Sequence, residues 1–222
     1  MIHNFSRFCE DVINKEVKKT NDDPSLLFTD VVGSSKMWQE NPKLMSKMLD
    51  KMFTDIEEIS NKYKGFIVKT IGDAFMIHFS GSESLKNAIL AAIDIMKKTE
   101  LKLRIGICKG EMIEKITNIQ TYDLKDYFGE TVNIASRMES KVSENDHISF
   151  THLDELSEKQ SEEIFDIIND YNPEKIVYSE SCDDYGLNRE KRSARLLSDM
   201  QINYCKSSEE LKGVGELIAY TF

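Results

Sequence analysis

Two aspartates in this sequence stand where short apolar runs end in tight turns. Asp73 follows Gly72 at the corner between two runs of strand-forming residues, and Asp30 ends an earlier apolar run just before Gly33. A carboxylate at a strand end is often only a turn former. Two of them beside a Gly/Ser-rich loop with free backbone N–H groups suit a divalent cation and a phosphate chain. The first prediction is therefore a metal and phosphate site.

Several segments carry a more specific signal together than any of them carries alone. They are FTDVVGSS at 28–35, VKTIGDAF at 68–75, LRIGI at 103–107, YFGETVNIASRM at 127–138 and a short KGVG at 212–215. In this order and spacing they resemble the catalytic domain of class III nucleotidyl cyclases, from about residue 26 to residue 137 and again at 212–215. The resemblance implies an enzyme that closes the ribose 3′-hydroxyl of a nucleoside triphosphate onto its own α-phosphate and releases pyrophosphate.

The resemblance implies a two-metal centre. Asp30 and Asp73 match the two metal-binding aspartates of the family, and the backbone carbonyl of Val31 is a further expected ligand. Two Mg²⁺ or Mn²⁺ ions are expected in each active site, where they would activate the 3′-oxygen and steady the leaving oxygens.

The resemblance also implies the phosphate ligands. Gly33, Ser34 and Ser35 occupy the phosphate-cradling turn, where the family often has Phe-Thr after the glycine. Ser-Ser is more polar but keeps the N–H donors. Arg104 matches an arginine that contacts the terminal phosphates, and Lys212 matches a lysine that binds the triphosphate.

The remaining expected site residues handle the ribose, the transition state and the base. Asn133 matches the residue that orients the ribose, and Arg137 matches the arginine that stabilises charge developing on the α-phosphate. Lys69 and Asp126 carry the pattern of adenylate cyclases, in which the lysine donates to a ring nitrogen and the aspartate accepts from the exocyclic amine. Guanylate cyclases usually have Glu and a small residue there. ATP is the predicted substrate, and GTP or a pyrimidine nucleotide stays open as the alternative.

In the family each site forms between two subunits. We call Asp30, Asp73 and Arg104 the metal half of the site. The base half comprises the other residues that the family draws from the second subunit: Lys69, Asp126, Asn133, Arg137 and Lys212. Because this chain holds both halves, it is predicted to work as a head-to-tail homodimer with two symmetric sites.

Composition narrows the function classes. The 222 residues are 40% hydrophobic with a formal net charge of −10. This acidity gives no basic face for nucleic acid or for an anionic membrane surface. No apolar run approaches the length of a bilayer span, and the N-terminus lacks a signal peptide's apolar core. The cysteines are scattered at 9, 108, 182 and 205, which predicts reduced thiols in a cytoplasmic protein.

The elements that must position these residues read as one α+β domain. Strand, helix, strand hairpin, helix and strand follow one another between 25 and 107, which predicts a ferredoxin-like antiparallel sheet with helices packed on it. Asn41 and Pro42 are typical of a helix start. His78 alternates with apolar neighbours on a predicted strand, so a structural role is expected. The segment 129–141 reads as the helix that carries Asn133 and Arg137 on one face.

The predicted organisation is an N-terminal helical extension over 1–24 and a catalytic domain over 25–222, with an insertion around 157–200. Apolar residues recur at helical spacing up to Val17, either as a surface helix or as a dimer contact. Between 111 and 125 the chain is longer and more polar than is usual in the family, so the dimer arm is expected to differ there. Met1 and the family-like final segment favour a complete small protein.

Two rival hypotheses remain beside an adenylate cyclase. One is a cyclase for another nucleotide. The other is a non-catalytic module that senses nucleotides through the same fold; loss of a metal aspartate, of Asn133 or of Arg137 would favour it, and all are present.

Overall fold

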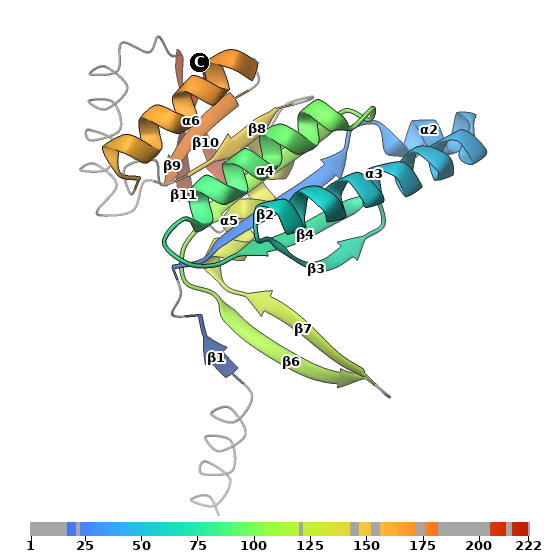
Figure 1. The fold of residues 1–222 in the computed structure, drawn as a ribbon, viewed down its shortest axis with the longest axis horizontal. Helices are drawn as coiled ribbons and strands as arrows, with labels where there is room; N and C mark the ends of the chain where they lie inside the picture. Colours follow the sequence, from blue (N-terminus) through green and yellow to red (C-terminus); the bar gives the residue numbers. More distant parts are fainter. Residues whose placement is uncertain are drawn as a thin grey trace, which may run out of the picture.

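The protein is described by a computed structural model, which covers residues 17–20, 23–119, 122–142, 147–151, 156–171, 176–181, 205–211 and 215–221. The predicted architecture is confirmed: helices pack on a largely antiparallel sheet in one α+β fold (Figure 1). Among the helices in these ranges, none is long and apolar enough to cross a membrane.

The main sheet has eight strands in the order β10-β11-β9-β8-β5-β2-β4-β3. Neighbouring strands are antiparallel, except that β8 runs parallel to both β5 and β9. The strands are β2 (Ser25–Val31), β3 (Phe66–Ile71), β4 (Ala74–Phe79), β5 (Leu103–Lys109), β8 (Ile148–Phe150), β9 (Ile176–Ser181), β10 (Cys205–Leu211) and β11 (Gly215–Thr221). The last two strands of the chain, β10 and β11, pair antiparallel with each other.

Three long helices cover one face of this sheet: α3 (Pro42–Lys62), α4 (Ser84–Lys98) and α6 (Glu158–Tyr171) (Figure 1). Helix α3 begins as predicted, because the Asn41 side chain accepts a hydrogen bond from the Leu44 N–H at 3.1 Å and Pro42 stands in the first turn. The apolar stripes of α3 and α4 meet one side of β2 and β5 in the larger core, which includes Leu27 and Ile107.

The other face of the sheet carries a smaller core. Leu26 and Cys108, the strand neighbours of the residues in the larger core, point this way and pack with Ile134 and Met138. The segment involved is α5 (Glu130–Arg137), which continues as the π-helix η1 (Met138–Val142). The predicted helix over 129–141 is therefore present, with its last turn widened. Central strands covered on both faces explain why β2 and β5 are buried at most positions.

A second, three-stranded sheet projects from the body (Figure 1). It consists of β6 (Ile113–Ile119), β7 (Tyr122–Phe128) and β1 (Val17–Lys19), in the order β1-β6-β7. We call this sheet the arm. The helical extension predicted over 1–24 is wrong at β1, because Val17–Lys19 pair antiparallel with β6. Residues 1–16 lie outside the described part of the chain.

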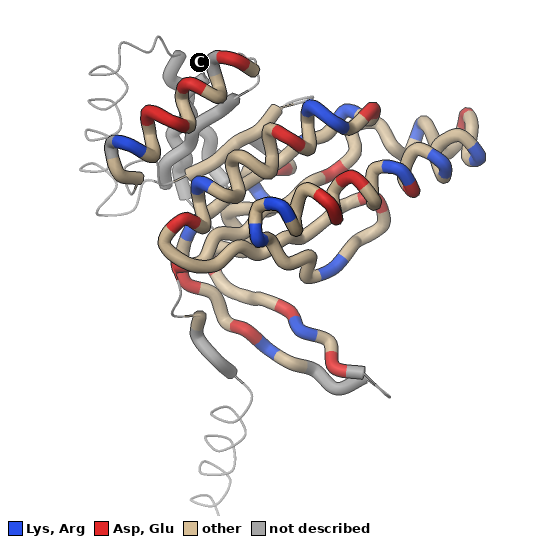
Figure 2. Tube along the Cα trace, viewed as in Figure 1, with Lys and Arg blue, Asp and Glu red and all other residues tan. Residues whose placement is uncertain are grey.

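Charges of both signs are interspersed on the described helices and along the arm (Figure 2). The segment around 157–200, where an insertion was predicted, contains α6 and β9, and residues 182–200 fall outside the ranges above.

Candidate active site

The metal half of the predicted site assembles at one end of three neighbouring strands. In the register of β2 with β5, Asp30 lies directly opposite Arg104. In the register of β2 with β4, Thr29 lies opposite Phe75, two residues after Asp73 in the β3–β4 turn. Gly72 allows that turn through its positive φ of 65°. Sheet register therefore brings Asp30, Asp73 and Arg104 to the same edge.

The side chains of this cluster meet only part of one another's hydrogen-bonding capacity. Arg104 donates a hydrogen bond from Nη2 to Oδ2 of Asp30. Oδ2 of Asp73 is buried and has no hydrogen-bond partner. A buried carboxylate oxygen without a partner is costly unless something binds it. A divalent cation with oxygen ligands fits that atom, Asp30 and the Val31 carbonyl. Within the described residues no group of three His, Cys, Asp or Glu side chains forms a metal cage.

The predicted phosphate turn follows β2 directly. Gly33 has a φ of 73° and precedes the short helix α2 (Ser34–Glu40). A Cβ at Gly33 would meet nothing within 4 Å, so the glycine serves the backbone conformation and leaves open space beside it. The Val32 N–H donates to the Lys102 carbonyl at 2.9 Å, which continues the β2–β5 pairing up to the turn, and the Gly33 carbonyl accepts from the Met37 N–H at 3.2 Å as α2 begins. Ser34 and Ser35 stand at the start of α2, beside the metal half.

Behind Arg104 lies a residue that the sequence prediction missed. Glu139 of η1 is 9% exposed, and its Oε1 lies 3.3 Å from Nε of Arg104. Burial raises the pKa of the Glu139 carboxyl to about 7, although Arg104 lowers it and Asp30 raises it further. The close approach needs Gly106, where a Cβ would lie 2.3 Å from the Glu139 N and from the Ala135 carbonyl. Glu139 follows the recognised motif by one residue, which is the only sequence signal for it.

The base half contains a formed ion pair. Lys69 on β3 places its Nζ 2.6 Å from Oδ2 of Asp126 on β7. Oδ1 of the same carboxylate accepts a hydrogen bond from the Tyr127 N–H at 2.8 Å. Both side chains are partly buried, with exposed fractions of 31% for Lys69 and 16% for Asp126. The structure therefore brings together the two residues predicted to read the base, although 57 residues separate them in the sequence.

Helix α5 carries the two residues predicted to act on the ribose and the α-phosphate. Asn133 is exposed and Arg137 is half-buried, one turn further along the helix. The helix is anchored by Thr131, whose hydroxyl donates to the Glu111 carbonyl at 2.8 Å. Both side chains thus project from a helix whose other face is buried. Lys212 lies outside the described residues.

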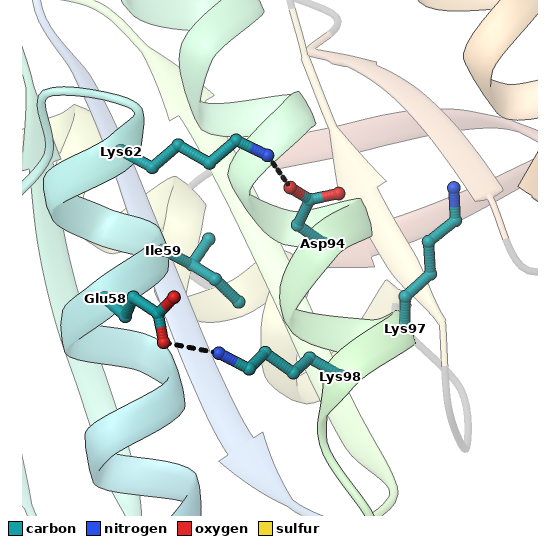
Figure 3. Close-up of a pocket in the computed structure, with 6 residues that line it drawn as sticks. All are labelled: Glu58, Ile59, Lys62, Asp94, Lys97 and Lys98. Carbon is teal, nitrogen blue, oxygen red and sulfur yellow. Dashed lines mark hydrogen bonds and ion pairs between the residues drawn. The ribbon is translucent and has the colours of Figure 1, made fainter.

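A surface pocket between α3 and α4 does not coincide with this site (Figure 3). Its volume is about 540 Å³, and none of the predicted site residues lines it. Its carboxylates already bind lysines: Lys62 to Asp94 at 2.7 Å and Lys98 to Glu58 at 2.6 Å. Exposed pairs of this kind hold two helices together weakly. The third lysine of the lining, Lys97, lies over the Tyr171 ring, 5.5 Å from its centroid.

Known proteins share both the sequence pattern and the fold. The family model of the adenylate and guanylate cyclase catalytic domain matches residues 16–168. A receptor-type guanylate cyclase of Caenorhabditis elegans, gcy-23, is 27% identical over 219 residues and covers 91% of this chain. Receptor-type adenylate cyclase B of Leishmania donovani is 30% identical over 173 residues, covering 57% of this chain. The matches span only 17% and 13% of those two relatives.

Solved structures show the same architecture. The guanylate cyclase domain of RhGC from Catenaria anguillulae, in complex with GTP, aligns with a TM-score of 0.61 at 18% identity, covering 91% of this chain and 96% of that one. The adenylyl cyclase CyaB from P. aeruginosa aligns with a TM-score of 0.59 at 18% identity, covering 93% and 96%. With the family model spanning most of its length, the chain belongs to the adenylate and guanylate cyclase catalytic domain family, the class III nucleotidyl cyclases.

Proposed function

We propose that this domain is an adenylate cyclase, which converts ATP to 3′,5′-cyclic AMP and pyrophosphate. The observation that carries the proposal is the ion pair between Lys69 and Asp126, which joins β3 to β7 within one chain. The Lys69 ammonium is a hydrogen-bond donor held beside an acceptor, the Asp126 carboxylate. One donor and one acceptor side by side can recognise the hydrogen-bonding edge of a base.

The order of donor and acceptor decides which purine is read. Adenine offers a donor at its exocyclic 6-amine and an acceptor at N1, whereas guanine offers an acceptor at O6 and a donor at N1. Asp126 facing the 6-position and Lys69 facing N1 therefore select adenine. The reverse placement would select guanine. Cytosine repeats the adenine order and uracil the guanine order, so the size of the base must separate purines from pyrimidines.

The metal half neutralises the negative charge of the triphosphate during the reaction. Two Mg²⁺ or Mn²⁺ ions held by Asp30, Asp73 and the Val31 carbonyl would activate the 3′-hydroxyl and stabilise the leaving pyrophosphate. Arg104 and the turn at 33–35 bind the terminal phosphates through charge-assisted and backbone N–H hydrogen bonds. Lys212 is assigned to the same triphosphate.

The base half positions the reacting atoms. Asn133 holds the ribose so that its 3′-oxygen faces the α-phosphate in line with the leaving group. Arg137 stabilises the charge that develops on the α-phosphate oxygens. Both stand on a rigid helix, which favours a fixed geometry in the transition state.

The two halves are proposed to meet across a homodimer. Lys69 and Asp73 are four residues apart in the sequence, yet Lys69 pairs with the arm, whereas Asp73 belongs to the strand-end cluster with Asp30. One chain would give its metal half to one site and its base half to the other. A monomer would be inactive under this proposal.

The relatives leave a second candidate, a guanylate cyclase. Proteins named as guanylate and as adenylate cyclases both match this chain at similar identity. The Lys69 and Asp126 pair favours ATP because it differs from the Glu and small residue usual in guanylate cyclases.

A product assay tests the proposal directly. The purified chain is offered ATP, GTP, CTP and UTP separately with Mn²⁺, and cyclic products are resolved by mass. Cyclic AMP as the main product supports the proposal. Cyclic GMP would overturn the base assignment and keep the cyclase. No product from a confirmed dimer would overturn the catalytic role of the isolated chain.

A further inference from the structure

An aromatic stack lies directly behind the base-reading aspartate. The Tyr127 ring is 2% exposed and stacks on the His78 ring of β4, with 4.5 Å between centroids and 2° between planes. Tyr127 also belongs to the smaller core beneath α5. The stack thus joins β7 of the arm to β4 of the main sheet, and Asp126 is the residue immediately before Tyr127.

A charged layer closes this stack from the outside. Nζ of Lys125 lies 2.7 Å from Oε2 of Glu114 and sits over the rings of Tyr127 and Phe66, at 5.4 and 5.7 Å from their centroids. The Tyr127 hydroxyl donates to the same Glu114 oxygen at 3.3 Å. Burial raises the pKa of Tyr127, so the hydroxyl remains a donor at neutral pH.

This packing matters because no backbone hydrogen bonds between the described strands fix the position of Asp126 relative to Lys69. Among the described strands, β3 pairs only with β4, and β7 pairs only with β6. The two residues therefore belong to different sheets. Their separation depends on side-chain contacts between the arm and the body, and the buried Tyr127 ring, stacked on the partly buried His78, is one of those contacts.

We propose that the His78–Tyr127 stack is a positioning device for base selectivity, which holds Asp126 in the place where it faces the 6-position of the purine. The inference rests on the proposed function. The Tyr127 N–H fixes one carboxylate oxygen of Asp126, and the Tyr127 ring fixes the strand that carries both. If the strand shifts, the acceptor moves along the base edge toward N1, where guanine offers a donor. A looser stack thus lowers the preference for adenine.

The test compares variants that remove the stack with variants that keep it. Tyr127→Leu and His78→Ala remove one ring each. Tyr127→Phe keeps the stack and loses only the hydroxyl, and His78→Phe keeps an aromatic face. Each variant is assayed for kcat/KM with ATP and with GTP in the dimeric, full chain. Equilibrium binding of the same two nucleotides is measured in parallel, and thermal unfolding checks that each variant is folded.

The expected result is a fall in the ATP-to-GTP ratio by about tenfold in Tyr127→Leu and His78→Ala, a size in keeping with the loss of one aromatic pair. Tyr127→Phe and His78→Phe should retain most of the ratio. If the stack had a purely structural role, its loss would lower kcat/KM equally for ATP and GTP. The ATP-to-GTP ratio would then stay unchanged, and this result would overturn the inference.

The outcome for the wild type separates this inference from the proposed function. If the wild type binds ATP better than GTP without turning it over, the catalytic proposal fails and the binding ratios of the variants still decide the inference. If the wild type turns over nucleotides without a preference between ATP and GTP, the inference fails and the cyclase stands. If it binds neither nucleotide, both fail.

Discussion

The two halves of the proposed site are built in different ways. In the metal half, Asp30 and Arg104 are register partners on hydrogen-bonded strands of one sheet. In the base half, Lys69 and Asp126 come from two sheets that share no backbone ladder within the described strands, and packed side chains hold them together. Both halves contain a salt-bridged carboxylate, but only the first has its geometry set by the backbone.

This difference separates the chemistry from the selectivity. Register in a sheet buried on both faces is hard to change, because a slip by one residue turns every side chain to the other face. The contacts between the arm and the body can be altered by single substitutions. A fold built this way can keep one reaction while its base preference varies, in keeping with relatives that are named for both purines.

The sharpest way to break the metal half is Asp73→Ala. This substitution removes the buried Oδ2 that has no hydrogen-bond partner, and with it a proposed metal ligand. We expect kcat to fall about 10³-fold or more, because losing the metal costs several kcal/mol of transition-state stabilisation. Cyclic product formation measures the effect, with Asp50→Ala on the exposed face of α3 as a matched control. A variant that retains most of its activity would remove Asp73 from the metal site.

Mixing two inactive variants tests whether the halves meet across a dimer. Asp30→Ala damages only the metal half, and Arg137→Ala damages only the base half. A heterodimer of the two contains one intact site, so an equal mixture should recover about a quarter of the wild-type activity per chain if subunits pair at random. Activity is measured after exchange, and mass spectrometry verifies that heterodimers form. A dead mixture containing heterodimers would rule out shared sites.

Replacing both residues of the ion pair in the base half should change the nucleotide preference. Lys69→Glu with Asp126→Cys installs the residues usual in guanylate cyclases and leaves an adenine edge with unmatched polar groups. Mispairing of this kind costs on the order of 10²-fold in kcat/KM for ATP relative to GTP. Competition between the two nucleotides measures the ratio directly. If the double variant stayed active with the same preference between ATP and GTP, the base would have to bind away from these two residues.

Glu139 gives a predicted effect on stability rather than on turnover. Its pKa is raised from 4.5 to about 7 in the folded chain, chiefly by burial. A raised carboxyl pKa stabilises the fold fully below the unfolded value, and that contribution is lost as the pH rises through about 7. The loss amounts to roughly 3 kcal/mol at 1.36 kcal/mol per pKa unit.

Denaturant unfolding of the metal-free protein between pH 4.5 and pH 7.5 measures this loss. Glu139→Gln should flatten the pH dependence, whereas Glu57→Gln, at an exposed position on α3, should leave it intact. An equally steep profile in Glu139→Gln would show that other groups govern the pH dependence.

Much of the fold could be predicted because its signals are local. Asn41 and Pro42 marked the start of α3, and Gly72 marked the hairpin corner. At the N-terminus the same periodicity misled: the stripe up to Val17 suggested a helix, but tertiary pairing with β6 makes that end a strand.

The site residues named from the motifs remain predictions, although the structure brings several of them into contact. What the sequence did not disclose depends on distant segments. No prediction was made for Glu139, whose burial depends on Gly106 admitting the helix backbone. His78 was expected to be structural, but no local pattern could pair it with Tyr127.

The first strand of the arm has a mechanical consequence. Lys115 on β6 is the register partner of Val17 on one side and of Asp126 on the other. The hydrogen bonds of an antiparallel ladder run perpendicular to the strands, so Val17, Lys115 and Asp126 lie in one row across the arm. A pull on the chain at Val17 would act along this row on the carboxylate that we propose reads the base.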